Sequence, residues 1–113
     1  MKGALFTAEI EPALANAQGR IPRPRPQSAH LRRVCAVRSF TRNVIGLDTF
    51  VPLRTGAMLW VTLPNMAPML GSVIWAEDLS CGCLLGKPLN RDQFDRLTKL
   101  AEPNLPAAAS AAR

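Results

Sequence analysis

The clearest hydrophobic pattern of this chain lies in residues 51–89, where three short apolar runs follow one another. The runs cover residues 57–63, 69–76 and 81–85, and Gly, Pro, Asn or Asp residues separate them. Short apolar runs with such boundaries are typical of the strands of a β-meander and too short for helices. Because these runs are apolar on both faces, they fit a small barrel whose outer surface is partly covered. The pattern predicts an all-β domain of antiparallel strands.

Weaker patterns on the N-terminal side extend this domain. Within residues 31–42, Val34, Cys35 and Val37 favour a strand. Residues 43–46 have the composition of a turn in which Gly46 is free to adopt positive φ. Residues 47–51 then resume as a short strand.

One helix is predicted, and it covers residues 90–100. Asn90 can cap its N-terminus, and Gln93 can reach back to complete a capping box. The helix presents one apolar face, which we expect to dock on the barrel and which consists of Phe94, Leu97 and Leu100.

The first thirty residues carry weaker signals. Thr7 could cap a short helix over residues 7–18, although Pro12 would disturb all but its first turn. Residues 20–29, R-I-P-R-P-R-P-Q-S-A, alternate Arg and Pro and favour an extended arm. The predicted organisation is a flexible basic extension over residues 1–30, a barrel with a C-terminal helix over 31–100, and a disordered Ala-rich tail over 101–113.

The charge of the chain is concentrated in its N-terminal part. The formal net charge is +6, and all of this excess lies in residues 1–42, because basic and acidic residues balance over the remainder. Almost all of these basic residues are arginines, whose planar fork suits phosphate. The Arg/Pro arm could therefore lie along a phosphate-bearing ligand or another protein, or it could serve only as a linker.

Cysteine and histidine give little support for catalysis or metal binding. Cys35, Cys81 and Cys83 form an odd set without the spacing of a disulfide scaffold, and we expect buried or half-buried thiols on strands. His30 lies in the Arg/Pro arm without a nucleophile or carboxylate nearby in the sequence, so we expect a solvated side chain. The sequence therefore predicts no enzyme activity, no metal site and no cofactor.

Three segments of the central block closely resemble the second half of a PilZ domain. They read G-A-M-L-W-V-T-L-P from Gly56, G-S-V-I-W from Gly71 and G-C-L-L-G-K-P-L from Gly82. A helix opening just after the last segment is also what the family shows, while Leu85 stands where the family usually has Phe. The resemblance extends over residues 31–100. It implies a small six-stranded antiparallel β-barrel with a C-terminal helix.

Many PilZ domains are bacterial receptors for the second messenger cyclic di-GMP, so the resemblance implies a signalling module. The family holds the nucleotide with an R-x-x-x-R pair on an N-terminal loop and a D/N-x-S-x-x-G segment on a following strand and turn. The arginines pair with the phosphates and stack on guanine, and the short polar side chains and the glycine admit the base edges.

Both ligand motifs are altered in this chain. T-R-N-V-I-G, residues 41–46, occupies the place of D/N-x-S-x-x-G and retains only the glycine, with Asn replacing the serine. The arginines of the arm lie where the pair is expected, but none is followed by Arg four positions later. The candidate cyclic di-GMP contacts that the resemblance implies are Arg20, Arg23, Arg25, Asn43 and Gly46.

Two functions remain open at this point, and a third is disfavoured. The chain could be a PilZ-type signalling module that binds cyclic di-GMP, or a PilZ-like adaptor that contacts an unidentified protein partner without the nucleotide. The pI of about 10.3 suggests nucleic acid. However, Trp60, Trp75 and four Phe sit mostly at core-like positions, which argues against a base-stacking platform. Without an apolar run of membrane length or a signal-peptide core, we expect a cytoplasmic location.

Overall fold

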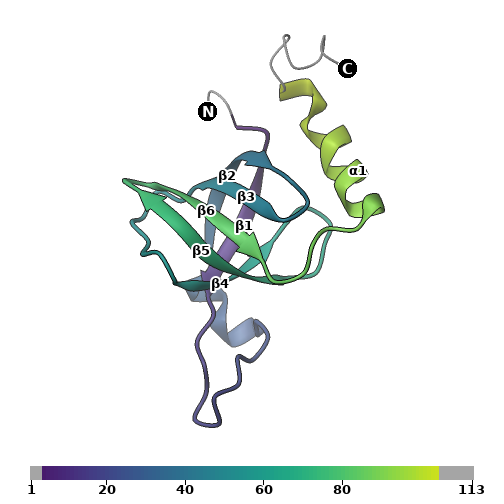
Figure 1. Cartoon of the computed structure of the whole chain (residues 1–113). Helices are drawn as coiled ribbons and strands as arrows, with labels where there is room; N and C mark the ends of the chain where they lie inside the picture. Colours follow the sequence, from purple (N-terminus) through teal and green to yellow (C-terminus); the bar gives the residue numbers. More distant parts are fainter. Residues whose placement is uncertain (1–3, 105–113) are drawn as a thin grey trace.

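The computed structural model describes residues 4–104, which fold into a closed six-stranded antiparallel β-barrel with one α-helix at its C-terminal end (Figure 1). The strands follow the order β1-β2-β3-β6-β5-β4 around the barrel. The strands are β1 (Phe6–Pro12), β2 (Arg33–Phe40), β3 (Val44–Asp48), β4 (Met58–Thr62), β5 (Met69–Glu77) and β6 (Ser80–Leu85). The helical segments are η1 (Pro26–Leu31), α1 (Arg91–Ala101) and η2 (Glu102–Asn104). The predicted fold class is confirmed.

The first strand corrects the prediction for the N-terminal region. The expected helix over residues 7–18 is wrong, since β1 is a strand that pairs with both β2 and β4 and closes the barrel. Ala8 and Ile10 are buried and alternate with exposed Thr7 and Glu9, so the segment has the period of two of a half-buried strand. The barrel therefore begins well before the boundary expected at residue 31.

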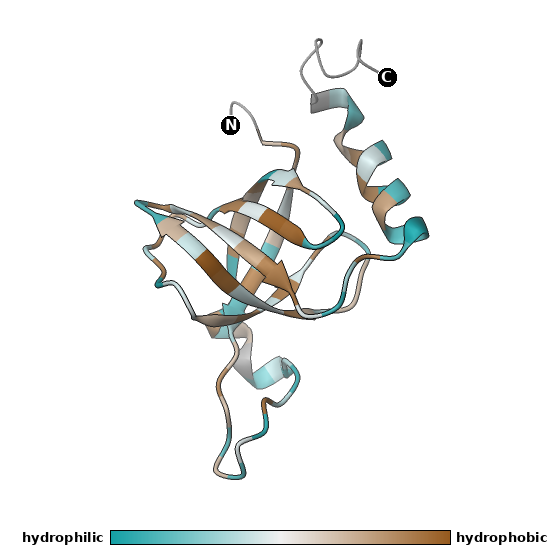
Figure 2. Ribbon diagram, viewed as in Figure 1, coloured by the Kyte–Doolittle hydropathy of each residue, from teal (hydrophilic) through white to brown (hydrophobic). Residues whose placement is uncertain are grey.

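The barrel interior is filled by aliphatic side chains and three thiols. Hydrophobic residues are frequent along the strands (Figure 2), and the buried ones form one core cluster. Cys35, Cys81 and Cys83 are all buried on strands, as predicted. Burial raises the pKa of Cys83 to about 12, and burial together with the neighbouring Cys81 thiol raises the pKa of Cys35 to about 12. These thiols therefore act as small apolar groups of the core.

The meander of β4, β5 and β6 forms as predicted, apart from the position of Trp75. Trp75 was expected at a core-like position, but a register shift between Val73 and Trp75 places Val73 in the core and leaves Trp75 45% exposed. Gly82 on β6 is the partner of Trp75 in the pairing of the two strands. A Cβ there would lie 2.0 Å from Trp75 Nε1, so the indole occupies that space.

The turn between β2 and β3 lies earlier than predicted. The Thr41 hydroxyl accepts hydrogen bonds from the backbone N–H groups of Asn43 (3.2 Å) and Val44 (3.0 Å), which closes the turn over residues 41–43. Gly46 is consequently in the middle of β3, and its expected positive φ is wrong. A larger residue there would displace the Ser39 side chain, because a Cβ would lie 2.5 Å from Ser39 Oγ.

Helix α1 confirms the predicted capping box, in which the Asn90 side chain accepts from Gln93 N and the Gln93 side chain accepts from Asn90 N. Phe94 packs on Phe40 with ring centroids 5.3 Å apart, and Leu97 is buried. Leu100 departs from prediction: it is 44% exposed, and Ala101 fills the buried position one residue later.

No helix among residues 4–104 has the length and apolarity needed to cross a bilayer. Of the predicted disordered tail over residues 101–113, Glu102–Asn104 forms a short 3-10 turn, and residues 105–113 lie outside the described part.

Candidate functional site: two grooves on the outside of the barrel

The structure places the five predicted ligand residues on three separate elements. Arg20, Arg23 and Arg25 are exposed on the long connection between β1 and β2. Asn43 is exposed in the β2–β3 turn, where its carbonyl accepts a hydrogen bond from Leu85 N at 2.8 Å. Gly46 lies in β3. Arg23 and Gly46 line different grooves, so the structure does not bring the two halves of the predicted site together.

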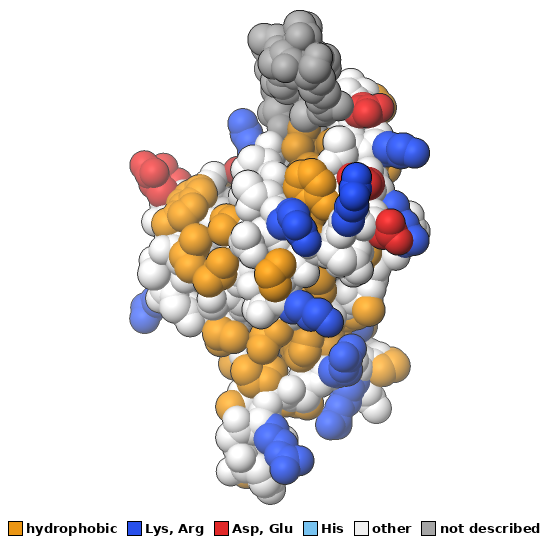
Figure 3. Space-filling model, turned by 45° about the vertical axis from the view of Figure 1, so that its right-hand side comes forward, with side chains coloured by type: hydrophobic (Ala, Val, Ile, Leu, Met, Phe, Trp, Pro, Cys, Tyr) orange, Lys and Arg blue, Asp and Glu red, His pale blue; other side chains and the backbone are white. Residues whose placement is uncertain are grey.

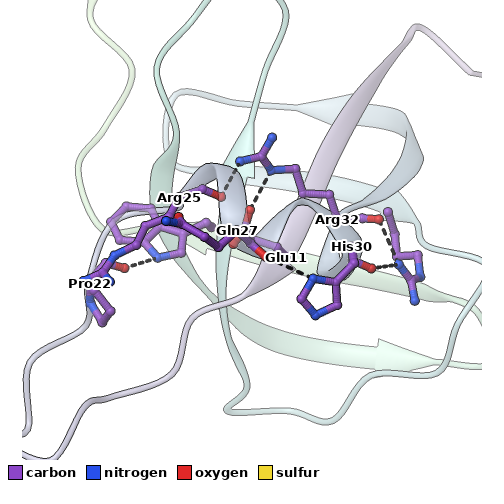
Figure 4. Close-up of polar contacts among 8 residues, drawn as sticks. Glu11, Pro22, Arg25, Gln27, His30 and Arg32 are labelled. Atoms are coloured by element: carbon purple, nitrogen blue, oxygen red, sulfur yellow. Dashed lines mark hydrogen bonds and ion pairs between the residues drawn. The ribbon is translucent and has the colours of Figure 1, made fainter.

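The arginine arm, residues 20–25, is held against the barrel at two points (Figure 4). Trp60 Nε1 donates to the carbonyl of Pro22 at 3.0 Å, which ties the middle of the arm to β4. Arg32 Nη2 donates to the carbonyl of Arg25 at 3.2 Å, and its Nε donates to Glu11 Oε1 at 2.8 Å. Glu11 is a buried residue of β1, so this ion pair joins the end of the arm to that strand.

The arm is shorter than the extended segment predicted over residues 20–29. Pro26–Leu31 forms the 3-10 helix η1, since its carbonyls find local donors: His30 Nδ1 lies 3.1 Å from Gln27 O, and Arg33 Nη1 donates to His30 O at 2.9 Å. His30 is exposed, as predicted. Its side chain contributes to this turn and contacts neither groove.

The first groove, here the arm groove, has a volume of about 430 Å³ and lies where the arm meets β4, the start of β5 and the N-terminus of α1. It contains two basic side chains and one indole, and none of its described lining residues is acidic. The lining residues are Arg23, Trp60, Pro68, Met69, Leu70, Gly86, Lys87, Pro88, Asn90 and Gln93. Figure 3 shows apolar side chains gathered on the lower half of the barrel and flanked by Lys and Arg.

The second groove, here the glycine-floored groove, has a volume of about 440 Å³ and crosses β2, β3 and the far end of β5. Its floor follows one row of paired positions in which Trp75 faces Gly82, Gly82 faces Gly46, and Gly46 faces Ser39. The two glycines are buried, because the Trp75 indole lies over Gly82 and the Ser39 side chain lies over Gly46. The lining residues are Arg38, Ser39, Gly46, Leu47, Asp48, Trp75, Glu77, Asp78 and Ser80.

Asp48 is the most constrained carboxylate of the glycine-floored groove. Arg38 Nη1 donates to its Oδ2 at 2.8 Å, and Ser80 Oγ donates to its Oδ1 at 2.7 Å. These two hydrogen bonds, with the charge of Arg38, hold the pKa of the Asp48 carboxyl below its ordinary value of 3.8. The groove thus combines one arginine with three acidic residues, so its lining has a formal excess of negative charge at neutral pH.

Sequence reasoning did not identify Trp60, Trp75 and Lys87 as residues that line the grooves. Trp60 was assigned to the core, yet its ring is half-buried and its N–H reaches the arm. Trp75 was also assigned to the core, and only the register shift in β5 turns it outward. The sequence signal for Trp75 was Gly82 within the predicted strand over residues 81–85, because a glycine in a strand often marks a close approach.

Comparisons with protein-family models, curated proteins and solved structures find no match to this chain. Within residues 4–104, no group of three or more His, Cys, Asp and Glu side chains is placed to hold a metal ion. The two grooves are therefore the features on which a functional proposal can be built.

Proposed function

We propose that this chain is a PilZ-type signalling module. The observation that carries the proposal is architectural: the segments that resemble the PilZ family form β4, β5 and β6 of a closed six-stranded antiparallel barrel. A capped helix follows the final P-L, at Pro88 and Leu89, as the resemblance implies. The fold alone does not determine what such a module binds, so the ligand has to be inferred from the grooves.

An anionic, aromatic ligand such as cyclic di-GMP is best accommodated by the arm groove. Arg23 and Lys87 supply positive charge for phosphate, and the half-buried indole of Trp60 supplies an apolar wall. Arg20 and Arg25 lie on the same arm and add to the local positive potential. If the chain binds cyclic di-GMP, we expect the nucleotide in the arm groove.

A second candidate function, a PilZ-like adaptor without nucleotide binding, is favoured by the position of Gly46, the one residue of the D/N-x-S-x-x-G motif that this chain retains. Gly46 lines the acidic glycine-floored groove, whereas Arg23 lies in the arm groove. The two halves of a nucleotide site would then be separated, and three carboxylates near one half would repel a phosphodiester.

Isothermal titration calorimetry of the full chain with cyclic di-GMP tests the two candidates. A receptor is expected to bind with a Kd of about 1–10 µM. Replacing Arg20, Arg23 and Arg25 by Ala, or Arg23 and Lys87 by Ala, should abolish the heat of binding. Arg54→Ala is the matched control, because Arg54 is an exposed arginine that lines neither groove.

The outcomes separate the candidates clearly. If the wild-type chain releases no binding heat at about 1 mM ligand, receptor function is excluded and the adaptor stands. If binding survives in both arm variants, the nucleotide does not bind in the arm groove.

A further inference from the structure

The glycine-floored groove carries an exposed aromatic surface that the proposed nucleotide site does not use. Trp75 Nε1, Cδ1 and Cε2 all lie within 2.6 Å of where a Gly82 Cβ would be, so the five-membered ring lies flat on the backbone of β6. One face of the ring is therefore covered by the strand, and the residue remains 45% exposed. The free face of an indole is the preferred aromatic surface for a cation.

Three carboxylates line the same groove as this indole. Glu77 and Asp78 follow Trp75 at the end of β5 and are exposed, and Asp48 lies across the groove on β3. Asp48 is engaged by Arg38 and Ser80. Among the described residues, Glu77 and Asp78 form no salt bridge, so their charge faces solvent. The groove therefore favours a guanidinium or ammonium group beside an apolar stem.

The chain itself displays such a segment. The arginine arm places exposed Arg20 and Arg23 beside Pro22 and Pro24, and residues 13–47 contain no acidic residue. Extended Arg/Pro segments dock on aromatic-lined, acidic grooves because their backbone is already stiff and their arginines are long.

The arm cannot reach the glycine-floored groove of its own chain in the observed structure. The arm is bonded to Trp60, and its Arg23 lines the groove at the Met69–Leu70 end of β5. Trp75, Glu77 and Asp78 lie at the other end of that strand, roughly 15–20 Å away at about 3.3 Å per residue. An arm and a groove that meet must therefore come from different molecules.

We propose that the glycine-floored groove binds the arginine arm of a second copy of this chain. An arginine of the incoming arm lies over the exposed face of Trp75, with its guanidinium between Glu77 and Asp78. The contact joins two different surfaces, so it is heterologous and can propagate from copy to copy. It is small and charged, so the association is weak and weakens with added salt. The inference depends neither on cyclic di-GMP nor on the PilZ resemblance.

A charge-swap experiment on the full chain tests the contact by sedimentation velocity over about 0.01–1 mM protein. The groove variant is Glu77→Arg/Asp78→Arg, and the arm variant is Arg20→Glu/Arg23→Glu. The wild type is expected to self-associate as concentration rises, and each variant alone should stay monomeric because its arm and groove have the same sign. An equimolar mixture of the two variants should associate again, since each arm then meets a groove of opposite charge.

Two controls make the result decisive. Asp92→Arg/Asp95→Arg changes charge equally on the exposed face of α1 and should leave self-association intact. Trp75→Ala should weaken association at least several-fold while circular dichroism shows a folded barrel. A wild type that remains monomeric to about 1 mM, or variants that associate alone, or a mixture that stays monomeric, would each overturn the proposal.

Discussion

The arm groove and the glycine-floored groove are alike in size and opposite in charge. Their volumes are about 430 and 440 Å³, and each contains one tryptophan from the barrel wall. The arm groove has two basic residues and no acidic one among its described lining residues, whereas the other has three acidic residues and one arginine. The two grooves therefore do not differ in volume or aromatic content. They differ in charge, and the charged residues come largely from segments at the strand ends.

Trp60 and Trp75 differ in how much they contribute to the stability of the fold. Replacing each by Ala should give the largest difference in unfolding free energy between the two grooves. Trp60→Ala is expected to lower the free energy of unfolding by about 2–3 kcal/mol, because the ring is half-buried and its N–H holds Pro22. Trp75→Ala should cost about 1 kcal/mol or less, since the residue is largely at the surface. Urea unfolding followed by circular dichroism measures both. Equal losses would contradict the structural role assigned to Trp60.

The arm groove should also depend on the anchor at the end of the arm. Arg32→Ala removes the guanidinium that donates to buried Glu11 and to the carbonyl of Arg25, and should cost about 1–3 kcal/mol of unfolding free energy. Hydrogen exchange of residues 20–25 should accelerate in this variant. Arg54→Ala, an exposed arginine outside both grooves, is the matched control and should change stability little.

The glycine floor can be tested by adding one methyl group. Gly46→Ala places a Cβ 2.5 Å from Ser39 Oγ and should cost about 1 kcal/mol through crowding. In the double variant Ser39→Ala/Gly46→Ala the hydroxyl is gone, so part of the lost stability should return. A double-mutant cycle of unfolding free energies measures this coupling. Additive losses would show that Ser39 does not set the need for glycine.

The smallest expected effect is the pH dependence contributed by Asp48. Its pKa is lowered in the folded state, so the carboxylate stabilises the fold above its ordinary value of 3.8, and this contribution is lost as pH falls through the lowered value. The stability difference between wild type and Asp48→Asn should therefore be constant near neutral pH and shrink in acid. A pH-independent difference for Asp48→Asn would remove the ionic explanation.

Local patterns predicted much of the fold. The strands of the meander were predicted from local sequence patterns such as the apolar residues Leu59 and Val61, and the helix was predicted from the capping pair Asn90 and Gln93. Phe6–Pro12 was misjudged because its alternation is short and ends in proline. Its strand character depends on pairing with both β2 and β4.

The candidate site was less predictable than the fold. Arg23 was correctly singled out as an exposed cation in an arm, but its neighbours Trp60 and Lys87 come from distant segments. Gly46 was selected for a turn, whereas it serves as the floor of a groove against Ser39. Motif spacing along the chain could not reveal that these two residues lie in different grooves.

The sequence by itself determined that this chain is a small antiparallel β-barrel with a capped C-terminal helix and an arginine-rich arm. Periodicity, capping and charge clustering are encoded within a few neighbouring residues, so they can be read without the fold. Only the tertiary structure decided that the arm is tied to Trp60 and that a register shift in β5 turns Trp75 outward onto Gly82. Both outcomes depend on pairing between strands far apart in the chain, because closing a barrel sets which side chains become neighbours across its surface.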